Sequence, residues 1–400
     1  MLVYIKPSKA NGTITAPPSK SVAHRALICA ALSDGCEISN IEQSDDITAT
    51  LCALEALGAN TRVSENKVTL GGLSVAGITD TVINANESGS TLRFILPLCM
   101  ISGKRIKFTG AKRLFARDLS VYGEIAKSNG FEFSLNEDSL IVNGRLTAGT
   151  YCIRGDISSQ FVSGLLFALP LLDGDSEIKF STPVQSKPYI DLTVNVLSGF
   201  GIRIAETENG YFVKGNQRYK ANDLYVEGDC SNAAPLEAFN LFGGNVTVAG
   251  LNPNTVQGDR VYKEIFSTLK SGGCYDLQNC PDLAPLLFAL AAAFSGARFT
   301  GTARLKIKES DRANAMKTEL EKFGADISVA DNEVYINKSE LHAPGCVLDS
   351  HNDHRVVMAL SVLLSVYGGS ITGVQSVKKS YPGFFDDLKN LGIGVEIIDD

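Results

Sequence analysis

The chain has 400 residues, of which 44% are apolar and 20% are charged. This length and composition suffice for two or three domains that each bury a core, and they exclude a disordered protein. The net charge of -7 excludes a general affinity for nucleic acid or for anionic membranes, because both require excess positive charge. An anionic ligand would therefore have to bind a local cluster of Lys and Arg side chains.

The N-terminal sequence MLVYIKPSKANG lacks the charged segment, apolar core and cleavage site of a secretory signal. The longest apolar runs, near residues 161–172 and 283–294, are too short to span a bilayer. The nine cysteines form no CxxC pair, and their odd number does not suggest a disulfide framework. We therefore expect a soluble, cytoplasmic protein with reduced and mostly buried thiols.

A sequence pattern recurs six times, in which a helical apolar pattern ends at a glycine and a strand begins shortly afterwards. The glycines are Gly58, Gly130, Gly201, Gly273, Gly324 and Gly392. Their spacing is roughly 70 residues, with one shorter interval, as in a chain of internal repeats. A glycine supplies the left-handed backbone that ends a helix. Six such units predict a repeated α/β architecture, divided into two similar domains with a cleft between them.

After the glycine, units one, two, three and five continue as strand, polar turn and strand. The segments are TRVSENKVTL, FEFSLNEDSLIV, IRIAETENGYFV and ISVADNEVYI, which alternate apolar and polar residues as in hairpins with one buried face. The fourth unit instead continues as LQNCPDLAPLLFALAAAF, which places Asp282 before a long apolar helix. Local regularity is usually lost at functional sites, so this departure suggests a function near Asp282.

Each unit also contains a helix that opens with small polar residues. The clearest openings are Ser19-Lys20-Ser21, Ser88-Gly89-Ser90, Ser158-Ser159-Gln160, Ser231-Asn232 and Asn352-Asp353-His354. These residues are good N-caps, which is a purely structural explanation. A capped helix start also presents free N–H groups and a partial positive charge, which suit a phosphate or a carboxylate. Both interpretations remain open from the residues alone.

Charged residues at several junctions are candidates for binding and chemistry. Arg25 follows Lys20 and Ser21 by about one helical turn, and the loop GAKRLFARDLS carries Arg117. In RLKIKESDR, Lys308 and Arg312 would bind anions, while Glu309 between them would act as an acid or base. A solvated surface is the alternative for each of them. His351 and His354 lack the further His or Cys that a metal site needs, so we expect no metal.

Eight short motifs occur in the order and approximate spacing seen in EPSP synthases, a family of enolpyruvyl transferases. They are PPSKSVAHR, ESGSTLR, DISSQF, SKPYID, PDLA, KESDR, NDHR and KKSYPGFF. The chain thus resembles this family essentially from residue 6 to residue 390. The resemblance implies an α/β fold of two similar domains, each of three βαβαββ units, with the active site in the interdomain cleft. One domain would be residues 19–227, and the other residues 1–18 plus 228–400.

The resemblance also implies two substrates, phosphoenolpyruvate and shikimate 3-phosphate, each bound by residues at matched positions. Shikimate 3-phosphate would be held by Lys20, Ser21, Arg25, Ser158, Ser159, Gln160, Ser186, Tyr189, Asp282 and Lys308. Phosphoenolpyruvate would be held by Lys20, Gly89, Arg117, Gln160, Arg312, Arg355 and Lys379. Asp282, Glu309 and Lys20 would transfer protons in an addition followed by an elimination, without a metal or another cofactor. We expect the enzyme to be a monomer.

Two other functions remain open. The sister family that transfers enolpyruvyl to UDP-N-acetylglucosamine shares the fold, but it typically carries a reactive Cys before the matched arginine. The segment AKRLFAR has none. A non-catalytic binding protein for phosphorylated metabolites is the second alternative. Asp282 and Glu309 argue against it, because carboxylates beside anionic ligands weaken binding unless they transfer protons.

Overall fold

The computed structural model describes residues 1–398, whose contacts divide the chain into two compact units. The central unit is Pro18–Glu227. The terminal unit combines Met1–Pro17 with the chain from Gly228 onwards. Each unit has a hydrophobic core of its own, so each is described separately.

Within Pro18–Glu227, the strands form three four-stranded sheets, ordered β14-β3-β5-β4, β6-β7-β9-β8 and β10-β11-β13-β12. The strands are β3 (Cys36–Ser39), β4 (Asn60–Ser64), β5 (Lys67–Gly71), β6 (Thr81–Asn84), β7 (Ile106–Thr109), β8 (Glu132–Leu135), β9 (Ser139–Asn143), β10 (Thr150–Ile153), β11 (Ser176–Phe180), β12 (Ile204–Thr207), β13 (Gly210–Val213) and β14 (Leu224–Tyr225). The helices are α1 (Lys20–Ala31), α2 (Asp45–Ala56), α3 (Gly89–Ser102), α4 (Lys112–Phe115), α5 (Ser120–Asn129), α6 (Ser159–Ala168) and α7 (Lys187–Gly199).

The terminal unit, in its described part, has two four-stranded sheets, β16-β17-β19-β18 and β20-β21-β1-β22, and the two-stranded sheet β15-β2. Its strands are β1 (Leu2–Lys6), β2 (Asn11–Thr15), β15 (Asn245–Ala249), β16 (Cys274–Asp276), β17 (Ala297–Thr300), β18 (Asp326–Val329), β19 (Glu333–Asn337), β20 (Leu348–Asp349), β21 (Gly369–Thr372) and β22 (Gly394–Ile398). Its helices are α8 (Cys230–Ala238), α9 (Tyr262–Leu269), α10 (Ala284–Ala293), α11 (Arg312–Glu321), α12 (His354–Tyr367) and α13 (Phe384–Asn390).

The sheets repeat one pattern of pairing. In β6-β7-β9-β8, β6 and β7 are parallel, while β9 pairs antiparallel with both β7 and β8. With α3 and α5 as the connections, this segment is a complete βαβαββ unit. The four hairpins predicted from the sequence are confirmed as β4-β5, β8-β9, β12-β13 and β18-β19. The predicted departure of the fourth unit is also confirmed, because β16 after Gly273 forms no hairpin: the chain continues as the 3-10 helix Pro281–Leu283 and α10, and β16 pairs in parallel with β17.

The glycines that end the helices have left-handed backbones in five units, with φ between 72° and 102°. In the fourth unit, the prediction that Gly273 ends the helix is wrong by one residue. The neighbouring Gly272 has the left-handed φ of 78°, and Gly273 follows at 158°. Two adjacent glycines give the same local pattern, so the sequence alone did not distinguish them.

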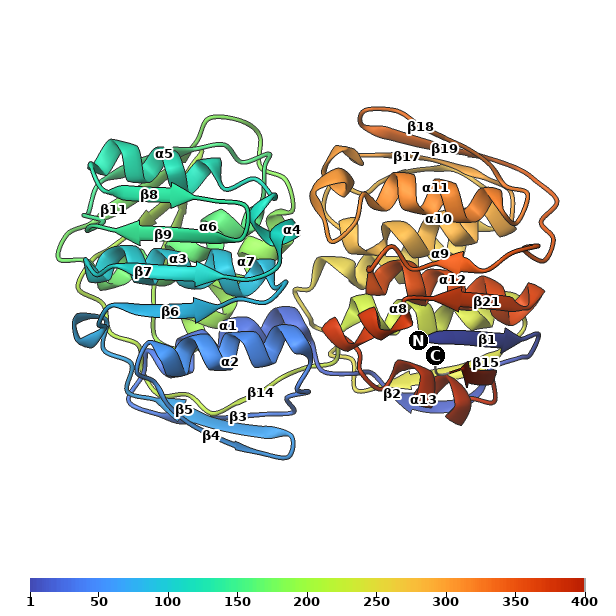
Figure 1. The fold of residues 1–400 in the computed structure, drawn as a ribbon, viewed down its shortest axis with the longest axis horizontal. Coiled ribbons are helices and arrows are strands. Elements are labelled where there is room, and N and C mark those ends of the chain that lie inside the picture. Colours follow the sequence, from blue (N-terminus) through green and yellow to red (C-terminus); the bar gives the residue numbers. More distant parts are fainter. Residues whose placement is uncertain (399–400) are drawn as a thin grey trace. The chain divides into compact units, whose positions relative to one another are not determined.

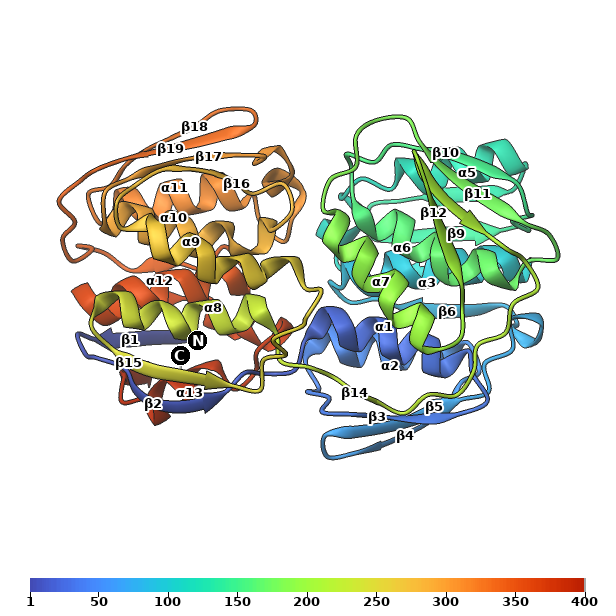
Figure 2. The same ribbon diagram turned by 180° about the vertical axis from the view of Figure 1, so that it is seen from behind.

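The sheets lie at the outside of each unit, and apolar helices fill the inside (Figures 1 and 2). In the central unit, α1, α3, α6 and α7 are the inner helices, and Phe94 of α3 and Phe161 and Phe167 of α6 are completely buried. Apolar side chains at these positions make the helices bury most of their surface. Their first turns carry polar side chains. Candidate site residues are therefore concentrated at the helix starts.

The prediction of mostly buried thiols is correct for five of the nine cysteines, all of them free. Cys29, Cys36, Cys99, Cys230 and Cys280 are buried. The other four are exposed on helix and strand surfaces or in a loop: Cys52, Cys152, Cys274 and Cys346.

Phe288 tests the core of the terminal unit. Its ring is fully buried in α10, 4.9 Å from the ring centre of Phe299 on β17. We expect Phe288→Ala to lower the free energy of unfolding of this unit by about 3–5 kcal/mol, because it leaves a cavity. Denaturant unfolding followed by circular dichroism measures the change. The control is Phe212→Ala on β13, where 40% of the side chain is exposed and the loss should be about 1 kcal/mol or less. Equal losses would contradict this description of the core.

Candidate active site

In the central unit, the N-terminal halves of four inner helices meet. Arg25 of α1 contacts Thr193 of α7, whose hydroxyl contacts Ser163 of α6 at 2.7 Å. Arg93 of α3 contacts Gln160 of α6. Because side chains from the first two turns touch in each pair, the four helix N-termini lie at one end of the unit. Unpaired N–H groups at helix N-termini favour anions, so this end is suited to bind one.

Arg25 is buried among neutral groups. Its Nε donates to Thr193 Oγ1 at 2.7 Å, and its two terminal nitrogens donate to the carbonyls of Ser21 and Tyr189 at 2.7 and 2.9 Å. Only 2% of the residue is exposed. Burial lowers the pKa of Arg25 to about 10, so this cation remains charged near neutral pH. A buried cation whose hydrogen-bond partners are all neutral is stabilised when an anion binds beside it.

Lys20, the first residue of α1, forms an ion pair with Asp46 in α2, with Nζ 2.7 Å from Oδ2. Both side chains are largely buried. The hydroxyl of Thr91 in α3 donates to the main-chain carbonyl of Asp46 at 3.4 Å, which joins α2 to the start of α3. Lys20 is therefore held in a fixed place by a neighbouring helix.

Gly89, the first residue of α3, lies against two guanidinium groups. A Cβ added at Gly89 would lie 2.8 Å from a terminal nitrogen of Arg117 and 3.0 Å from one of Arg93. Arg93 also donates to Gln160 Oε1 at 2.9 Å, and Gln160 Nε2 donates to Ser90 Oγ at 3.0 Å. A side chain at this position would push the two guanidinium groups aside. The structure brings the predicted Gly89, Arg117 and Gln160 together and adds Arg93.

The predicted hydroxyl residues lie at helix starts in the same unit. Ser158 caps α6 and accepts a hydrogen bond from the Gln160 N–H at 3.3 Å, and Ser159 is buried beside it. Ser186 precedes α7 with a left-handed φ of 57°, and it is buried. Left-handed backbone is unusual for serine and is kept where the surroundings hold it. Tyr189 presents its carbonyl to Arg25, so this helix start supports the arginine.

In the terminal unit, Arg312 contacts three carboxylates. Its Nε lies 2.9 Å from Asp353 Oδ2, and its terminal nitrogens lie 2.7 Å from Asp282 Oδ1 and 2.8 Å from Glu309 Oε2. Only 1% of Arg312 is exposed. The neighbouring carboxylates outweigh the effect of burial and raise the pKa of Arg312 well above its ordinary value. Arg312 therefore remains charged and joins the starts of α10, α11 and α12.

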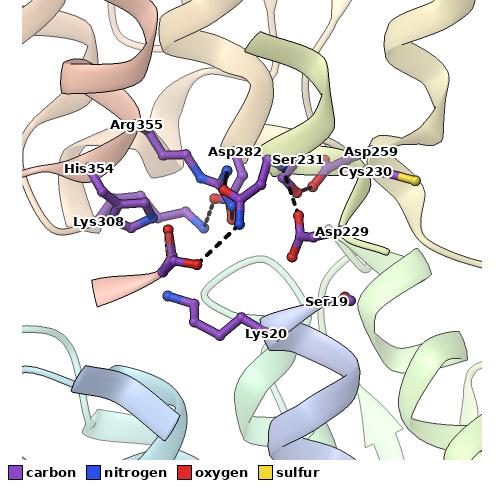
Figure 3. A network of polar contacts seen from close by, with 12 residues as sticks. Ser19, Lys20, Asp229, Cys230, Ser231, Asp259, Asp282, Lys308, His354 and Arg355 are labelled. Carbon is purple, nitrogen blue, oxygen red and sulfur yellow. Dashed lines mark hydrogen bonds and ion pairs between the residues drawn. The ribbon is translucent and has the colours of Figure 1, made fainter. Parts of the chain in front are cut away.

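Asp282 is surrounded by cations (Figure 3). Lys308 Nζ lies 3.1 Å from Oδ1, and a terminal nitrogen of Arg355 lies 3.7 Å from Oδ2. Burial alone would raise the pKa of Asp282, but Lys308, Arg312 and Arg355 hold it well below its ordinary value. Burial lowers the pKa of Lys308 more than Asp282 raises it. The cluster thus holds an ionised carboxylate among cations, in a place where anions could replace that carboxylate as the partner of the arginines.

Two more predicted residues lie at the edges of this cluster. Glu309 forms an ion pair with Arg312, three residues further along the chain, just ahead of α11. Lys379 ends the 3-10 helix Val374–Lys379 and donates to the main-chain carbonyl of Asn352 at 2.8 Å. The segment Asn352–Asp353 therefore lies next to both Lys379 and Arg312.

Three residues that orient the charged groups are marked in the sequence only as possible helix caps, or not at all. Asp353 caps α12 by accepting from the Arg355 N–H, and the same carboxylate binds Arg312. Asn232 of α8 accepts from an Arg355 terminal nitrogen at 2.7 Å and donates to the Ser380 carbonyl at 3.3 Å. Asp46 had no local signal. A helix cap uses only one side-chain oxygen. Where several polar residues follow one another at a helix start, the remaining polar groups can therefore make a second, tertiary contact.

The structure contains no group that suggests a metal centre within residues 1–398. There, no three His, Cys, Asp or Glu side chains gather where they could hold an ion. None of the helices in that range is both long and apolar enough to cross a membrane.

The chain was compared with families of known function. The model of the EPSP synthase (3-phosphoshikimate 1-carboxyvinyltransferase) family matches residues 5–388. The chain belongs to the EPSP synthase family. A relative from Clostridium kluyveri named 3-phosphoshikimate 1-carboxyvinyltransferase is 40% identical over 414 residues, which cover 98% of this chain and 97% of the relative. A relative of the same name from Clostridioides difficile is 37% identical over 422 residues, with 97% of each chain covered.

A solved structure has the same fold. EPSP synthase from Acinetobacter baumannii superposes with a TM-score of 0.78 at 20% sequence identity, and the match covers 99% of this chain and 100% of that one. At this identity the likeness concerns the fold alone. The family resemblance and the mixed α/β fold of repeated βαβαββ units that the sequence predicted are confirmed.

Asp353→Asn tests the ion pairs of Arg312. Burial raises the pKa of Asp353, but Arg312 outweighs it and lowers that pKa below the ordinary 3.8. The ionised carboxylate therefore stabilises the fold above about pH 4, and this stabilisation is lost as the pH falls through the folded pKa. We expect Asp353→Asn to lower the free energy of unfolding by about 3 kcal/mol near pH 7, and by less in acid. Denaturant unfolding at several pH values measures both effects.

The control for this experiment is Asp156→Asn. Its hydrogen bond to Arg154 lowers the pKa of Asp156 to about 2, but the pair is partly exposed. Its replacement should therefore cost less than about 1 kcal/mol. A variant Asp353→Asn as stable as the wild type near pH 7 would contradict the importance of the buried pair.

Proposed function

We propose that this chain transfers the carboxyvinyl (enolpyruvyl) group of phosphoenolpyruvate to the 5-hydroxyl of shikimate 3-phosphate. The products are 5-enolpyruvylshikimate 3-phosphate and phosphate, in the shikimate pathway to chorismate and the aromatic amino acids. The family of the chain supports this proposal. The observation that carries it is the ionised Asp282 held between Lys308, Arg312 and Arg355, because a binding site for anions alone would gain nothing from a carboxylate at its centre.

Substrate binding would use two sets of cations. Lys20 and Arg25, with Ser158, Ser159, Gln160, Ser186 and Tyr189, would hold the phosphate and hydroxyls of shikimate 3-phosphate. Ser21 would contribute its hydroxyl at the start of α1, and Asp282 and Lys308 would contact the same substrate. Gly89, Arg117, Arg312, Arg355 and Lys379, with Lys20 and Gln160, would hold phosphoenolpyruvate. Arginine forks suit its carboxylate, and lysines supply compact charge to its phosphate.

The chemistry would proceed by addition and elimination. The 5-hydroxyl would attack C2 of phosphoenolpyruvate and give its proton to Asp282, while C3 gains a proton from Glu309 or Lys20. The tetrahedral adduct would then lose phosphate and the proton that C3 had gained. The cations stabilise the charge that develops on the phosphate and the carboxylate. No bound metal takes part in this scheme.

The low pKa of Asp282 fits a base that becomes stronger when substrate binds. In the structure, three cations lower that pKa. When the anionic groups of phosphoenolpyruvate draw Arg312 and Arg355 towards themselves, the field on Asp282 weakens and its pKa rises. Asp282 would then accept a proton from the hydroxyl more readily, so substrate binding prepares the base.

We also infer that the enzyme acts as a cytoplasmic monomer on these two small molecules. The acidic net charge supports the absence of a nucleic acid or membrane partner. The proposed reaction draws on residues of both units.

Asp282→Asn tests the proposed base. The amide keeps the shape of the side chain but cannot accept the proton, so we expect turnover to fall by at least about 100-fold. The affinity for shikimate 3-phosphate should change far less, since Arg25 and Lys20 remain. Product formation is followed by mass spectrometry and binding by calorimetry. Asp331→Asn, an exposed aspartate of the same unit that pairs with Lys306, is the control and should remain active. Undiminished turnover in Asp282→Asn would remove Asp282 from the mechanism.

A further inference from the structure

Glu319 is a buried carboxylate that the proposed reaction does not use. It lies two residues before the end of α11 and has no exposed surface. A buried carboxylate is costly unless it is paired and hydrogen bonded. Its Oε2 accepts from the Asp349 N–H at 2.9 Å and lies 2.8 Å from Lys322 Nζ, while its Oε1 lies 2.9 Å from His351 Nε2. Two of these three partners belong to the segment that leads into α12.

The same face of α11 binds this segment at two points. Arg312 and Glu319 are seven residues apart, which is about two helical turns, so their side chains lie on one side of the helix. Arg312 binds Asp353, and Glu319 binds Asp349 and His351. The segment Asp349–Asp353 is therefore attached to α11 at both of its ends.

Between these two attachments, the backbone is in an uncommon conformation. His351 and Asn352 have φ values of 50° and 54°, two left-handed residues in succession without a glycine. Such a turn persists only where its surroundings hold it. The Asp349 carboxylate accepts from the His351 N–H at 2.7 Å, and Ser350 Oγ accepts from the Asn352 N–H at 3.2 Å. Local hydrogen bonds thus shape the turn, and Glu319 fixes it to the helix.

The turn determines where two proposed phosphoenolpyruvate ligands lie. It directs the Asn352 carbonyl to Lys379 Nζ, which donates to it at 2.8 Å. The next residue, Asp353, carries the carboxylate that holds Arg312 Nε. A shift of the turn would therefore move the partners of Lys379 and Arg312 together. His24 of the central unit and the exposed His342 have no comparable connection to these ligands.

We propose that Glu319 and His351 are positioning residues, which fix the left-handed turn Asp349–Asp353 so that Lys379 and Arg312 keep the geometry that binds phosphoenolpyruvate. The inference rests on the proposed function. It concerns mainly the affinity for phosphoenolpyruvate, because most proposed ligands of shikimate 3-phosphate, such as Arg25 and Ser158, lie in the central unit. The other two, Asp282 and Lys308, lie in the terminal unit but outside the turn. Neither residue touches a reacting atom.

The test compares His351→Ala, His351→Gln and Lys322→Gln in steady-state kinetics with both substrates. In His351→Ala, the KM for phosphoenolpyruvate should rise about tenfold, because displaced groups bind less well. The KM for shikimate 3-phosphate and the melting temperature should stay nearly unchanged. The amide of Gln can donate to Glu319 in place of His351 Nε2, so His351→Gln should restore most of the affinity. Lys322→Gln, whose side chain contacts Glu319 but not the turn, should stay within about twofold of wild type.

Amide hydrogen exchange in peptides that span residues 349–353 gives a readout that does not depend on turnover. Exchange should become faster in His351→Ala and remain slow in Lys322→Gln. A wild type without turnover would refute the proposed function, while the exchange rates would still test the role of His351. An unchanged KM for phosphoenolpyruvate with unchanged exchange would overturn the inference. An equal rise in both KM values with a lower melting temperature would also overturn it, since this would indicate general destabilisation.

Discussion

The ion pairs of Arg312 hold the candidate site of the terminal unit together. One buried guanidinium contacts Asp282 ahead of α10, Glu309 ahead of α11 and Asp353 ahead of α12. Burying a charge costs free energy. The attraction between Arg312 and the three carboxylates offsets this cost for both the cation and the anions. The fixed directions of a guanidinium also set the angles at which the three segments approach. Packing of the apolar helix bodies brings the helix starts together, and Arg312 determines how they are arranged.

The distribution of charge explains how an acidic protein can bind two anionic substrates. The chain has a net charge of -7, whereas the candidate sites collect cations in places with little solvent. In the central unit, Arg25 has neutral partners and Arg93 lies beside Arg117 next to Gly89. In the terminal unit, Asp282 and its neighbours balance the cations. Electrostatic interactions are stronger where water is excluded, so a few buried charges outweigh many exposed ones.

Much of the fold could be predicted because it is repeated and local. Helix-ending glycines, alternating strands and polar helix starts recur along the chain, and each depends on residues that are close in sequence. Such patterns have a limit: the sequence predicted Gly273 as the helix-ending glycine, whereas Gly272 has that role, because either of two adjacent glycines fits the pattern. The pairing of the sheets was harder. β1 from the N-terminus pairs with β21 and β22 near the other end of the chain, which no local pattern indicates.

The sequence predicted the charged residues of the candidate site, but it did not indicate the residues that orient them. Lys308, Glu309 and Arg312 are conspicuous because they are charged and adjacent. Asn232 looked like an ordinary cap residue, yet it holds Arg355 from a position more than a hundred residues away in sequence. No sequence signal marked Asp46 or Glu319. Their roles arise from tertiary contacts, which is why a structure was needed to find them.

The central claim concerns the reaction, and the most direct measurement is phosphate release from phosphoenolpyruvate by the purified protein. The acceptors to compare are shikimate 3-phosphate, UDP-N-acetylglucosamine and none, without added metal. The account predicts release only with shikimate 3-phosphate, together with the carboxyvinyl product. Release only with the nucleotide sugar, or with neither acceptor, would contradict it.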